Sequence, residues 1–261
     1  MTAATEAGIV LFLHELADAA GVIALRYFRA TLPVDEKDDR SPVTEADRQI
    51  ELRLREMIMS RYPQHGIIGE EFGPYQPQAE FVWVIDPIDG TRSFITGRPL
   101  FGTIIGLLHQ GQPLLGLVDQ AYTKERWLGR QGQWATFNGA PTHVAPPRRL
   151  EQARLYTGSV GMFDDGKIEQ FLLLSRRAKV VQYYCDCYAY ALLSMGWVDA
   201  VVEQRLKLYD VAGLVPIITG AGGLVCDWQG RSVFAPDWSG QVIAASAHPL
   251  VEEVSDLLRG Q

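Results

Sequence analysis

The strongest constraint in this sequence is an apolar segment that leads directly into a pair of carboxylates. The stretch WVIDPIDGTRSF, residues 83–94, places Asp86 at the end of the apolar run and Asp89 three positions later, with Pro87 between them. Proline fixes φ and disfavours a simple continuation of the strand, so a turn can bring Asp89 back beside Asp86. Two such carboxylates, with the Ile88 carbonyl as a further ligand, suit a hard divalent cation such as Mg²⁺.

The two residues after this pair suit an anion. Gly90 lets the backbone approach a ligand closely, and a helical turn that opens at Gly90 and Thr91 would offer free N–H groups to a phosphate. The segment therefore predicts a metal site next to a phosphate site. The alternative is a strand followed by an Asx-type turn, in which both aspartates bind only the local backbone.

Other acidic residues stand at comparable positions in the chain. Glu70 and Glu71 follow the apolar pair Ile67-Ile68, and Asp210 stands at the head of an otherwise apolar helical segment. Adjacent carboxylates at a strand end repel each other unless a positive charge compensates them. The alternatives are a solvated acidic loop for Glu70 and Glu71 and a simple helix N-cap for Asp210.

Composition excludes some classes of protein. The chain has 261 residues, of which 47% are hydrophobic, enough for the core of one large domain or two small ones. Its formal charge of −7, without a long basic run, disfavours a nucleic-acid binder. Three cysteines (185, 187 and 226) favour a reduced, cytoplasmic setting over a disulfide framework. The first 20 residues lack a basic signal-peptide region and an unbroken apolar span, so neither a signal peptide nor a membrane anchor is expected.

The spacing of apolar residues predicts two helices, then a run of strands, then an alternation of strands and helices. The first helix is expected up to Tyr27, ended by Pro33 and the charged stretch 35–40, and the second starts at the N-cap Thr44. Strands are expected at 81–85, 103–108, 114–118, 126–128, 133–136, 154–157, 179–183, 198–202, 224–228 and 242–245, and further helices at 167–175, 188–195, 210–219 and 249–258. Gly220 is expected to end the third of these helices with a positive φ, and prolines at 141–147 suit a boundary between two halves.

Three motifs, in this order and spacing, resemble those of the inositol monophosphatase family: GEE at 69–71, DPIDGT at 86–91 and YDVAG at 209–213. This superfamily of Mg²⁺-dependent, lithium-sensitive phosphatases also includes the fructose bisphosphatases. The resemblance runs over nearly the whole chain, with one departure, because Tyr209 stands where the family motif has tryptophan. It implies a layered α/β/α/β/α sandwich and a homodimer. The N-terminal α+β half, 1–147, would carry most metal ligands, and the C-terminal α/β half, 148–261, would carry Asp210 and the substrate pocket.

The resemblance also implies roles for individual residues. The metal ligands would be Glu70, Asp86, the Ile88 carbonyl, Asp89 and Asp210, holding two or three Mg²⁺ ions, or Mn²⁺, per site. The phosphate would lie against Gly90, Thr91 and Arg92. Catalysis would use Glu70 together with Asp47, which would pair with Thr91 to orient the attacking water. For Asp47 the alternative is a helix-capping carboxylate three residues after Thr44.

Further stretches resemble the histidinol-phosphate phosphatase branch of the family, namely SFITG, PLFG, DCYAY and LKLYD. This branch would hydrolyse L-histidinol phosphate, a small phosphate monoester, in histidine biosynthesis. The substrate carries an ammonium group and an imidazole, and Asp186 and Glu203 would supply acidic partners. The alternatives are a helix N-cap for Asp186 and a surface acid at a strand end for Glu203. Tyr188, Tyr190 and Arg98 are further candidates for this pocket, although aromatic residues at such positions are more often part of the core.

Two other functions stay open from the sequence. One is an inositol-monophosphatase-like enzyme of broader specificity. The other is a regulatory protein that binds a metal or a phosphate without turnover. The presence of the whole set of motif residues argues against it, namely Glu70, Asp86, Asp89, Thr91 and Asp210.

Overall fold

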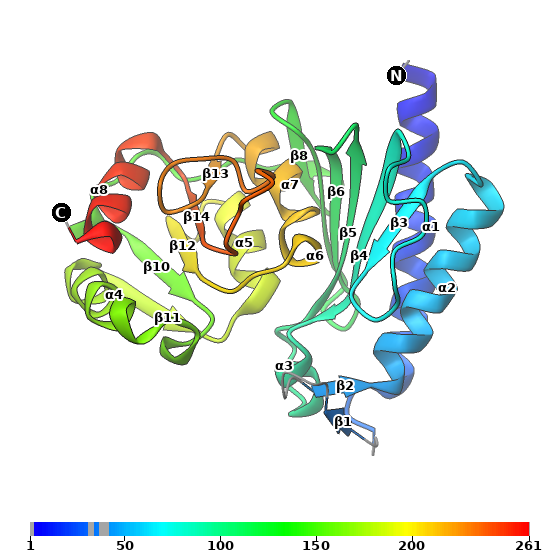
Figure 1. The fold of residues 1–261 in the computed structure, drawn as a ribbon, viewed down its shortest axis with the longest axis horizontal. Coiled ribbons are helices and arrows are strands. Elements are labelled where there is room, and N and C mark those ends of the chain that lie inside the picture. The colour runs from blue at the N-terminus through cyan, green and yellow to red at the C-terminus, as the bar shows by residue number, and fades with distance from the viewer. Residues whose placement is uncertain (1–2, 31–33, 37–41, 261) are drawn as a thin grey trace.

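Helices and sheets alternate in five layers in the computed structural model, which describes residues 3–30, 34–36 and 42–260 (Figure 1). At one side α1 (Ala3–Tyr27) and α2 (Glu45–Arg61) cover a seven-stranded sheet. Between this sheet and a five-stranded one lie α5 (Asp186–Ser194), α6 (Leu208–Val211) and α7 (Leu214–Gly220). At the far side α4 (Asp165–Arg177) and α8 (His248–Arg259) cover the second sheet. The α/β/α/β/α sandwich expected from the sequence is therefore confirmed.

The seven-stranded sheet has its strands in chain order, with only the first pair parallel. Its strands are β3 (Gly66–Gly69), β4 (Phe81–Asp89), β5 (Gly102–His109), β6 (Gln112–Gln120), β7 (Glu125–Arg130), β8 (Trp134–Phe137) and β9 (Ala140–Pro141). A small separate sheet pairs β1 (Val34–Glu36) with β2 (Pro42–Thr44), and α3 (Thr91–Ile95) follows β4. The meander of hairpins predicted for this part of the chain is present.

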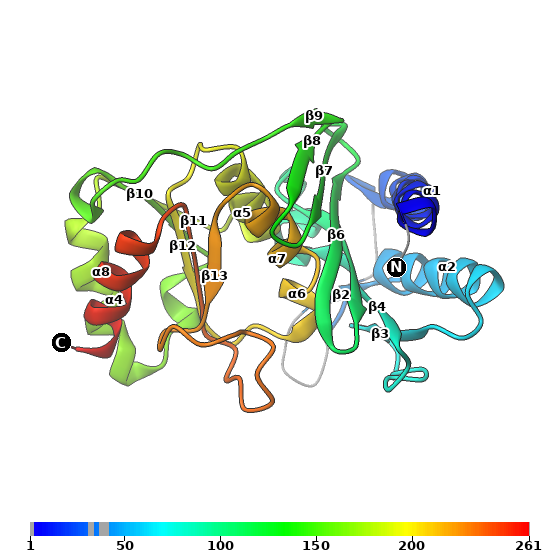
Figure 2. The ribbon, with the colours of Figure 1, turned by 90° about the horizontal axis from the view of Figure 1, so that it is seen from above.

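The five-stranded sheet belongs to the second half and has the order β11-β10-β12-β14-β13. Its strands are β10 (Arg154–Thr157), β11 (Val180–Tyr183), β12 (Ala200–Glu203), β13 (Leu224–Cys226) and β14 (Val242–Ala245). The strand β10 is parallel to β11 and β12, whereas β14 is antiparallel to both of its neighbours. Figure 2 shows the segment between β9 and β10 crossing from one sheet to the other.

The strand β4 differs from its predicted form, because it continues beyond Asp86. The register against β5 shifts between Asp86, which pairs with Ile104, and Asp89, which pairs with Gly102. Pro87 lies inside this irregularity, where the ladder does not require an N–H donor. The hydroxyl of Thr103 donates to the Pro87 carbonyl at 2.8 Å and holds the bulge in place.

The predicted helix at 210–219 is also different, because it is divided into α6 and α7. Gly220 does not end α7 with a positive φ, which occurs instead at Gly222 (φ 90°). Gly220 lies in the last turn of α7, where a Cβ would stand 2.1 Å from the Trp134 carbonyl oxygen. This glycine therefore serves close packing and not the helix cap.

Glycines allow the backbone of the central helices to contact the backbone of the seven-stranded sheet directly. A Cβ on Gly116 of β6 would stand 1.9 Å from the Gly213 carbonyl oxygen, and a Cβ on Gly129 of β7 would stand 2.3 Å from the Ile217 Cα. Backbone therefore meets backbone where side chains normally separate a helix from a sheet. We call this contact the glycine seam and define it by Gly106, Gly116, Gly129, Gly213 and Gly220.

One face of the helix α1 is buried against the rest of the structure, whereas Leu11, Val22 and Leu25 are exposed. Leu13, Leu16 and Ala20 are fully buried in the cluster that includes residues of α2 and of the seven-stranded sheet. By length and composition alone, Thr5–Tyr27 would suffice to cross a membrane, a criterion that a buried core helix also meets. The helix ends at Tyr27, as predicted. Pro33 and residues 37–40, which were expected to stop it, lie outside the described residues.

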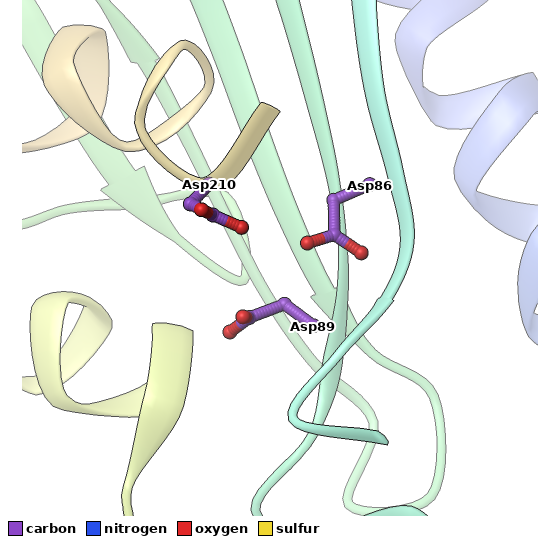
Figure 3. Close-up of side chains that lie close together, drawn as sticks. All are labelled: Asp86, Asp89 and Asp210. Carbon is purple, nitrogen blue, oxygen red and sulfur yellow. The ribbon is translucent and has the colours of Figure 1, made fainter. Parts of the chain in front are cut away.

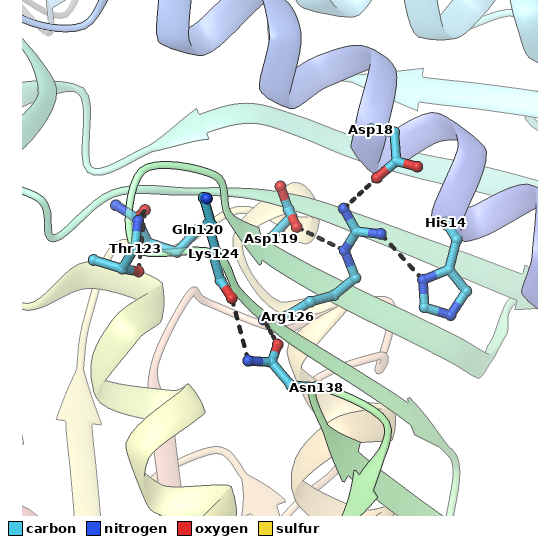
Figure 4. A network of polar contacts seen from close by, with 8 residues as sticks. All are labelled: His14, Asp18, Asp119, Gln120, Thr123, Lys124, Arg126 and Asn138. Atoms are coloured by element: carbon cyan, nitrogen blue, oxygen red, sulfur yellow. Dashed lines mark hydrogen bonds and ion pairs between the residues drawn. The ribbon is translucent and has the colours of Figure 1, made fainter.

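A network centred on Arg126 joins α1 to the sheet (Figure 4). This guanidinium donates to Asp119 of its own sheet at 2.7 Å and to Asp18 of α1 at 2.7 Å, and it contacts the His14 ring nitrogen at 3.1 Å. A cleft lies here between α1 and the strands β6 to β8. Because Arg126 already pairs with two carboxylates, the network fixes how α1 sits on the sheet.

The substitution Gly116→Ala tests the glycine seam. The added methyl group would overlap the Gly213 carbonyl, so we expect the free energy of unfolding to fall by about 2 kcal/mol or more. Urea denaturation followed by circular dichroism measures this change. The control is Gly8→Ala, because Gly8 of α1 has open space around its Cβ position and alanine favours a helix. Equal stability of Gly116→Ala and the unmodified chain would contradict the seam.

Candidate active site

Three aspartates from two distant segments meet between the seven-stranded sheet and α6. Asp86 and Asp89 belong to the end of β4, and Asp210 belongs to α6. Each offers a carboxylate oxygen, and these oxygens lie within 4.8 Å of one another. Figure 3 shows the three side chains converging on a common space. The close approach predicted for Asp86 and Asp89 is present, and Asp210 completes the group.

The local structure explains why these carboxylates face the same way. In a regular strand, residues three positions apart point to opposite faces, but the bulge at Pro87 changes this alternation. Asp89 then accepts a hydrogen bond from the Cys187 backbone N–H, at the start of α5. Asp210 accepts one from the Lys207 backbone N–H at 2.6 Å. Lys207 is the N-cap of α6 and Asp210 is the third residue of the helix, so the simple N-cap considered for Asp210 is not observed. These bonds fix two of the three carboxylates from elements of the second half.

The three carboxylates are costly as isolated charges. Asp86 is only 2% exposed and its Oδ1 has no hydrogen-bond partner. Burial, followed by the charges of Glu70 and Asp89, raises the pKa of Asp86 well above its usual range. Burial and the charge of Asp186 do the same for the pKa of Asp89, and burial raises the pKa of Asp210 to about 7. A divalent cation would relieve this repulsion and satisfy the buried oxygen, so the donor set fits Mg²⁺ or Mn²⁺.

Glu70 adds a fourth carboxylate from the loop after β3. Its charge contributes to the raised pKa of Asp86, Asp47 and Asp210, and it lines the same cavity as Asp89 and Asp210. Its position depends on Glu51 of α2, a fully buried residue. The Glu51 carboxylate accepts hydrogen bonds from the backbone N–H groups of Glu71 at 2.7 Å and Phe72 at 3.2 Å. The solvated acidic loop considered for this segment is therefore replaced by a loop anchored to α2.

Glu51 is a functional residue that the sequence alone does not point to. It forms a buried ion pair with Arg55 at 2.8 Å, and Arg55 donates to the carbonyls of Phe72 and Gly73, both at 2.9 Å. The available signal was an acid and a base four positions apart, next to the apolar stripe of Ile50 and Leu54. That signal is also typical of exposed helix faces, so it does not point to this role by itself.

Asp47 and Thr91 do not contact each other in the way that the resemblance implied. The Asp47 Oδ2 accepts hydrogen bonds from the Thr44 backbone N–H at 2.8 Å and the Thr44 hydroxyl at 2.6 Å, which forms a capping box. The Thr91 hydroxyl donates to the Ile88 carbonyl at 3.0 Å. Each side chain thus has a partner in its own local turn. The other oxygen of Asp47 is buried without a partner, and burial raises the pKa of Asp47 to about 6.

A cavity of about 510 Å³ opens next to the aspartates, between the two halves of the chain. The predicted site residues among its lining are Glu70, Asp89, Gly90, Thr91, Arg92, Asp186, Glu203 and Asp210. Asp86, Ile88 and Asp47 are buried and do not line it. Lining residues that the sequence analysis did not identify include Ser93, Thr96, Gly158, Ser159, Met162 and Tyr184. They lie in loops and short helices without a periodic pattern, so no sequence signal marked them.

The two candidate substrate acids do not have the alternative roles considered for them. Asp186 is the first residue of α5 and not its N-cap. It has a left-handed backbone (φ 46°) and accepts a hydrogen bond from the Ser93 hydroxyl at 3.2 Å. Glu203 ends β12 but is only 5% exposed, so it is not a surface acid. Its partner is the Tyr190 hydroxyl at 2.7 Å, and burial raises the pKa of Glu203 to about 8.

The other pocket candidates have different outcomes. Tyr190 and Arg98 line the cavity, and Arg98 donates to the Tyr184 carbonyl at 3.4 Å. Tyr188 does not line it, because its hydroxyl donates to Glu125 at 2.8 Å and its ring packs against Trp127. Tyr188 therefore packs against other residues of the protein, as the alternative to a pocket role proposed.

Comparisons with known proteins agree with this geometry. The model of the inositol monophosphatase family matches residues 8–258. The bifunctional phosphatase IMPL2, chloroplastic, of Arabidopsis thaliana is 45% identical over 246 residues, which are 94% of this chain and 71% of that protein. The histidinol-phosphatase of Chlorobaculum parvum is 36% identical, over 89% of this chain and 90% of that protein.

The solved structures show the same fold. The inositol monophosphatase from Zymomonas mobilis superimposes with a TM-score of 0.89 at 41% identity, covering 99% of this chain and 100% of that one. The chain therefore belongs to the inositol monophosphatase family of phosphatases.

Proposed function

We propose that this chain is a Mg²⁺-dependent phosphomonoesterase that hydrolyses L-histidinol phosphate to L-histidinol and phosphate. The observation that carries the proposal is the distribution of charge in one cavity. A buried group of aspartates fits a divalent cation, and two further acids, Asp186 and Glu203, line the same cavity without belonging to that group. The similarity to the Chlorobaculum parvum histidinol-phosphatase supports the same substrate.

The residues proposed to hold the metal are Glu70, Asp86, the Ile88 carbonyl, Asp89 and Asp210. Bound Mg²⁺ would supply charge neutralisation of the phosphate and a water molecule with a lowered pKa. Gly90 and Thr91 lie where β4 passes into α3, and they present the backbone on which we place the phosphate. Arg92 follows them in the cavity lining and adds a positive charge for this group.

Asp47 is proposed to orient the attacking water from behind the cavity. Its Oδ1 is buried and lacks a hydrogen-bond partner. The charge of Glu70 contributes to the raised pKa of Asp47. The role implied for Thr91 requires its hydroxyl to leave the Ile88 carbonyl and to turn toward Asp47. Water then attacks phosphorus, the phosphorus–oxygen bond to the alcohol breaks, and the alcohol oxygen takes up a proton.

The substrate specificity follows from the charges that remain after the metal site is filled. The cavity is lined by Glu70, Asp89 and Asp210, which belong to the metal group, and by Asp186 and Glu203, which do not. A cationic leaving group would compensate the last two, because an opposite charge favours the ionised form of a buried carboxyl. L-histidinol carries an ammonium group at the distance of two bonds from its ester carbon, whereas inositol carries no charge.

A second candidate is an inositol-monophosphatase-like enzyme of broader specificity. Two observations favour it, namely the 41% identity to the Zymomonas mobilis inositol monophosphatase and the hydroxyl groups of Ser93, Ser159 and Thr96 in the cavity lining. Hydroxyl groups can bind the hydroxyls of a neutral sugar without a net charge. The two candidates share the metal site and differ only in the leaving group.

A comparison of matched substrates separates the two candidates. Phosphate release is measured with Mg²⁺ for L-histidinol phosphate, for inositol 1-phosphate and for 3-(imidazol-4-yl)propyl phosphate, which has the histidinol skeleton without the ammonium group. We expect kcat/KM to be at least about tenfold higher for L-histidinol phosphate than for either other ester, since one well-placed ion pair supplies about 1.4 kcal/mol or more. Similar values for all three would favour the broader enzyme.

The substitution Asp86→Asn tests the metal site by two measurements. It removes a ligand charge but keeps the size of the side chain, so Mg²⁺-dependent turnover should fall by at least about a thousandfold. The metal-free variant should melt at the same temperature or higher, because one of several repelling carboxylates is gone. Mg²⁺ should raise the melting temperature of the unmodified chain and not that of the variant.

The matched control is Asp256→Asn, which neutralises an exposed aspartate of α8 paired with Arg259. Its turnover and its response to Mg²⁺ should equal those of the unmodified chain. Full activity of Asp86→Asn would overturn the metal site, and a large loss of stability in this variant would assign Asp86 a structural role.

A further inference from the structure

A buried pair of side chains lines the cavity without belonging to the group of three aspartates. Tyr190 of α5 is 3% exposed and Glu203 of β12 is 5% exposed, yet both line the cavity. The Tyr190 hydroxyl donates to the Glu203 Oε2 at 2.7 Å. This bond joins a helix of the central layer to the five-stranded sheet, and it ends on the one cavity acid that β12 supplies.

We propose that Tyr190 is a specificity-determining positioning residue, which acts through Glu203 to select phosphate esters with a cationic leaving group. The inference rests on the proposed function, because it names the residue that makes the acid of that site selective. Tyr190 itself does not need to touch the substrate. Its hydroxyl holds one carboxylate oxygen of Glu203, and the other oxygen then faces Gly158 at the cavity wall.

The surroundings of Glu203 leave this carboxylate little freedom. On the side of Oε1, a Cβ on Gly158 would stand 2.9 Å from this oxygen and 3.2 Å from the Met162 Sδ. On the side of Oε2 stands Tyr190. The carboxylate is therefore confined between the loop after β10 and α5. A substrate ammonium would meet a carboxylate that is already oriented, so less conformational entropy is lost on binding.

The hydrogen bond also affects the charge of Glu203. Burial raises the pKa of Glu203, whereas the hydrogen bonds from Tyr190 and from the Gly158 backbone act in the opposite direction. A donor to a carboxylate stabilises its ionised form. Without the Tyr190 hydroxyl, a larger fraction of Glu203 would be protonated and neutral, and its attraction for an ammonium group would be weaker. Orientation and charge thus depend on the same hydroxyl.

The same helix provides a matched control. Tyr188, two residues before Tyr190, also donates its hydroxyl to a glutamate, namely Glu125 at 2.8 Å. This second pair lies outside the cavity lining. Tyr188→Phe and Tyr190→Phe therefore remove the same group and the same kind of bond, but only one of them belongs to the cavity.

The test compares two substrates on these variants in the presence of Mg²⁺. For Tyr190→Phe we expect kcat/KM for L-histidinol phosphate to fall about tenfold, mainly through a higher KM. For 3-(imidazol-4-yl)propyl phosphate, which lacks the ammonium group, we expect a change of less than about twofold. Tyr188→Phe should leave both values unchanged. Equal losses on both substrates, or no loss on either, would overturn the inference.

A double-mutant cycle shows whether Tyr190 acts through Glu203. In a Glu203→Gln background, which keeps the size of the side chain but removes its charge, Tyr190→Phe should no longer alter the preference between the two substrates. An additional tenfold effect in that background would assign Tyr190 a direct contact and overturn its positioning role.

A second variant covers the case in which Tyr190→Phe folds poorly, as judged by its melting temperature. Gly158→Ala pushes on the same carboxylate from the Oε1 side, so it should cause the same selective rise in KM. If the unmodified chain itself shows no preference for the ammonium group, the proposed function fails. If that preference exists and neither Tyr190→Phe nor Gly158→Ala reduces it, only this inference fails.

Discussion

The contact of backbone with backbone along the glycine seam is the constraint on which the rest of the structure depends. At Gly116 and Gly129, any side chain would enter the space of Gly213 or Ile217. Only their absence lets α6 and α7 lie directly on β5, β6 and β7. Because Asp210 belongs to α6, the same contact brings it to the carboxylates at the end of β4. The glycine seam thus joins the two halves, and the same contact completes the group of three aspartates.

The rigid contact between the two halves holds the three carboxylates together although they repel one another. Three carboxylates share one space, and Asp86 keeps a buried oxygen without a partner. Left to themselves, such groups would turn away from one another or admit water. Fixed donors prevent this, because the backbone of Cys187 holds Asp89 and the backbone of Lys207 holds Asp210. The repulsion is therefore retained in the folded chain, and it makes a divalent cation the partner that the site lacks.

Patterns that act over a few residues could be predicted from the sequence, and contacts between distant segments could not. The helices and most strands follow from periodicity, and the acids at 70, 86, 89 and 210 follow from motif order. The continuation of β4 past Pro87 was missed because a proline suits a bulge as well as a strand end. Gly220 was assigned to a helix cap because a sequence does not show what packs against a glycine. The role of Glu51 does not follow from the sequence, because the backbone groups that it binds lie 20 and 21 residues further along the chain.

The residues proposed for the phosphate and the acids proposed for the leaving group are held in different ways, and this difference has a functional consequence. The residues proposed for the phosphate lie in one short run after β4, so their geometry is set by a single turn. The acids proposed for the leaving group come from α5 and β12, and each depends on a separate neighbour, Ser93 for Asp186 and Tyr190 for Glu203. We expect a substitution at Tyr190 to alter the setting of Glu203 while the backbone N–H groups that hold Asp89 and Asp210 stay in place. Preference for a leaving group can therefore change among chains of this fold while the phosphate chemistry stays the same.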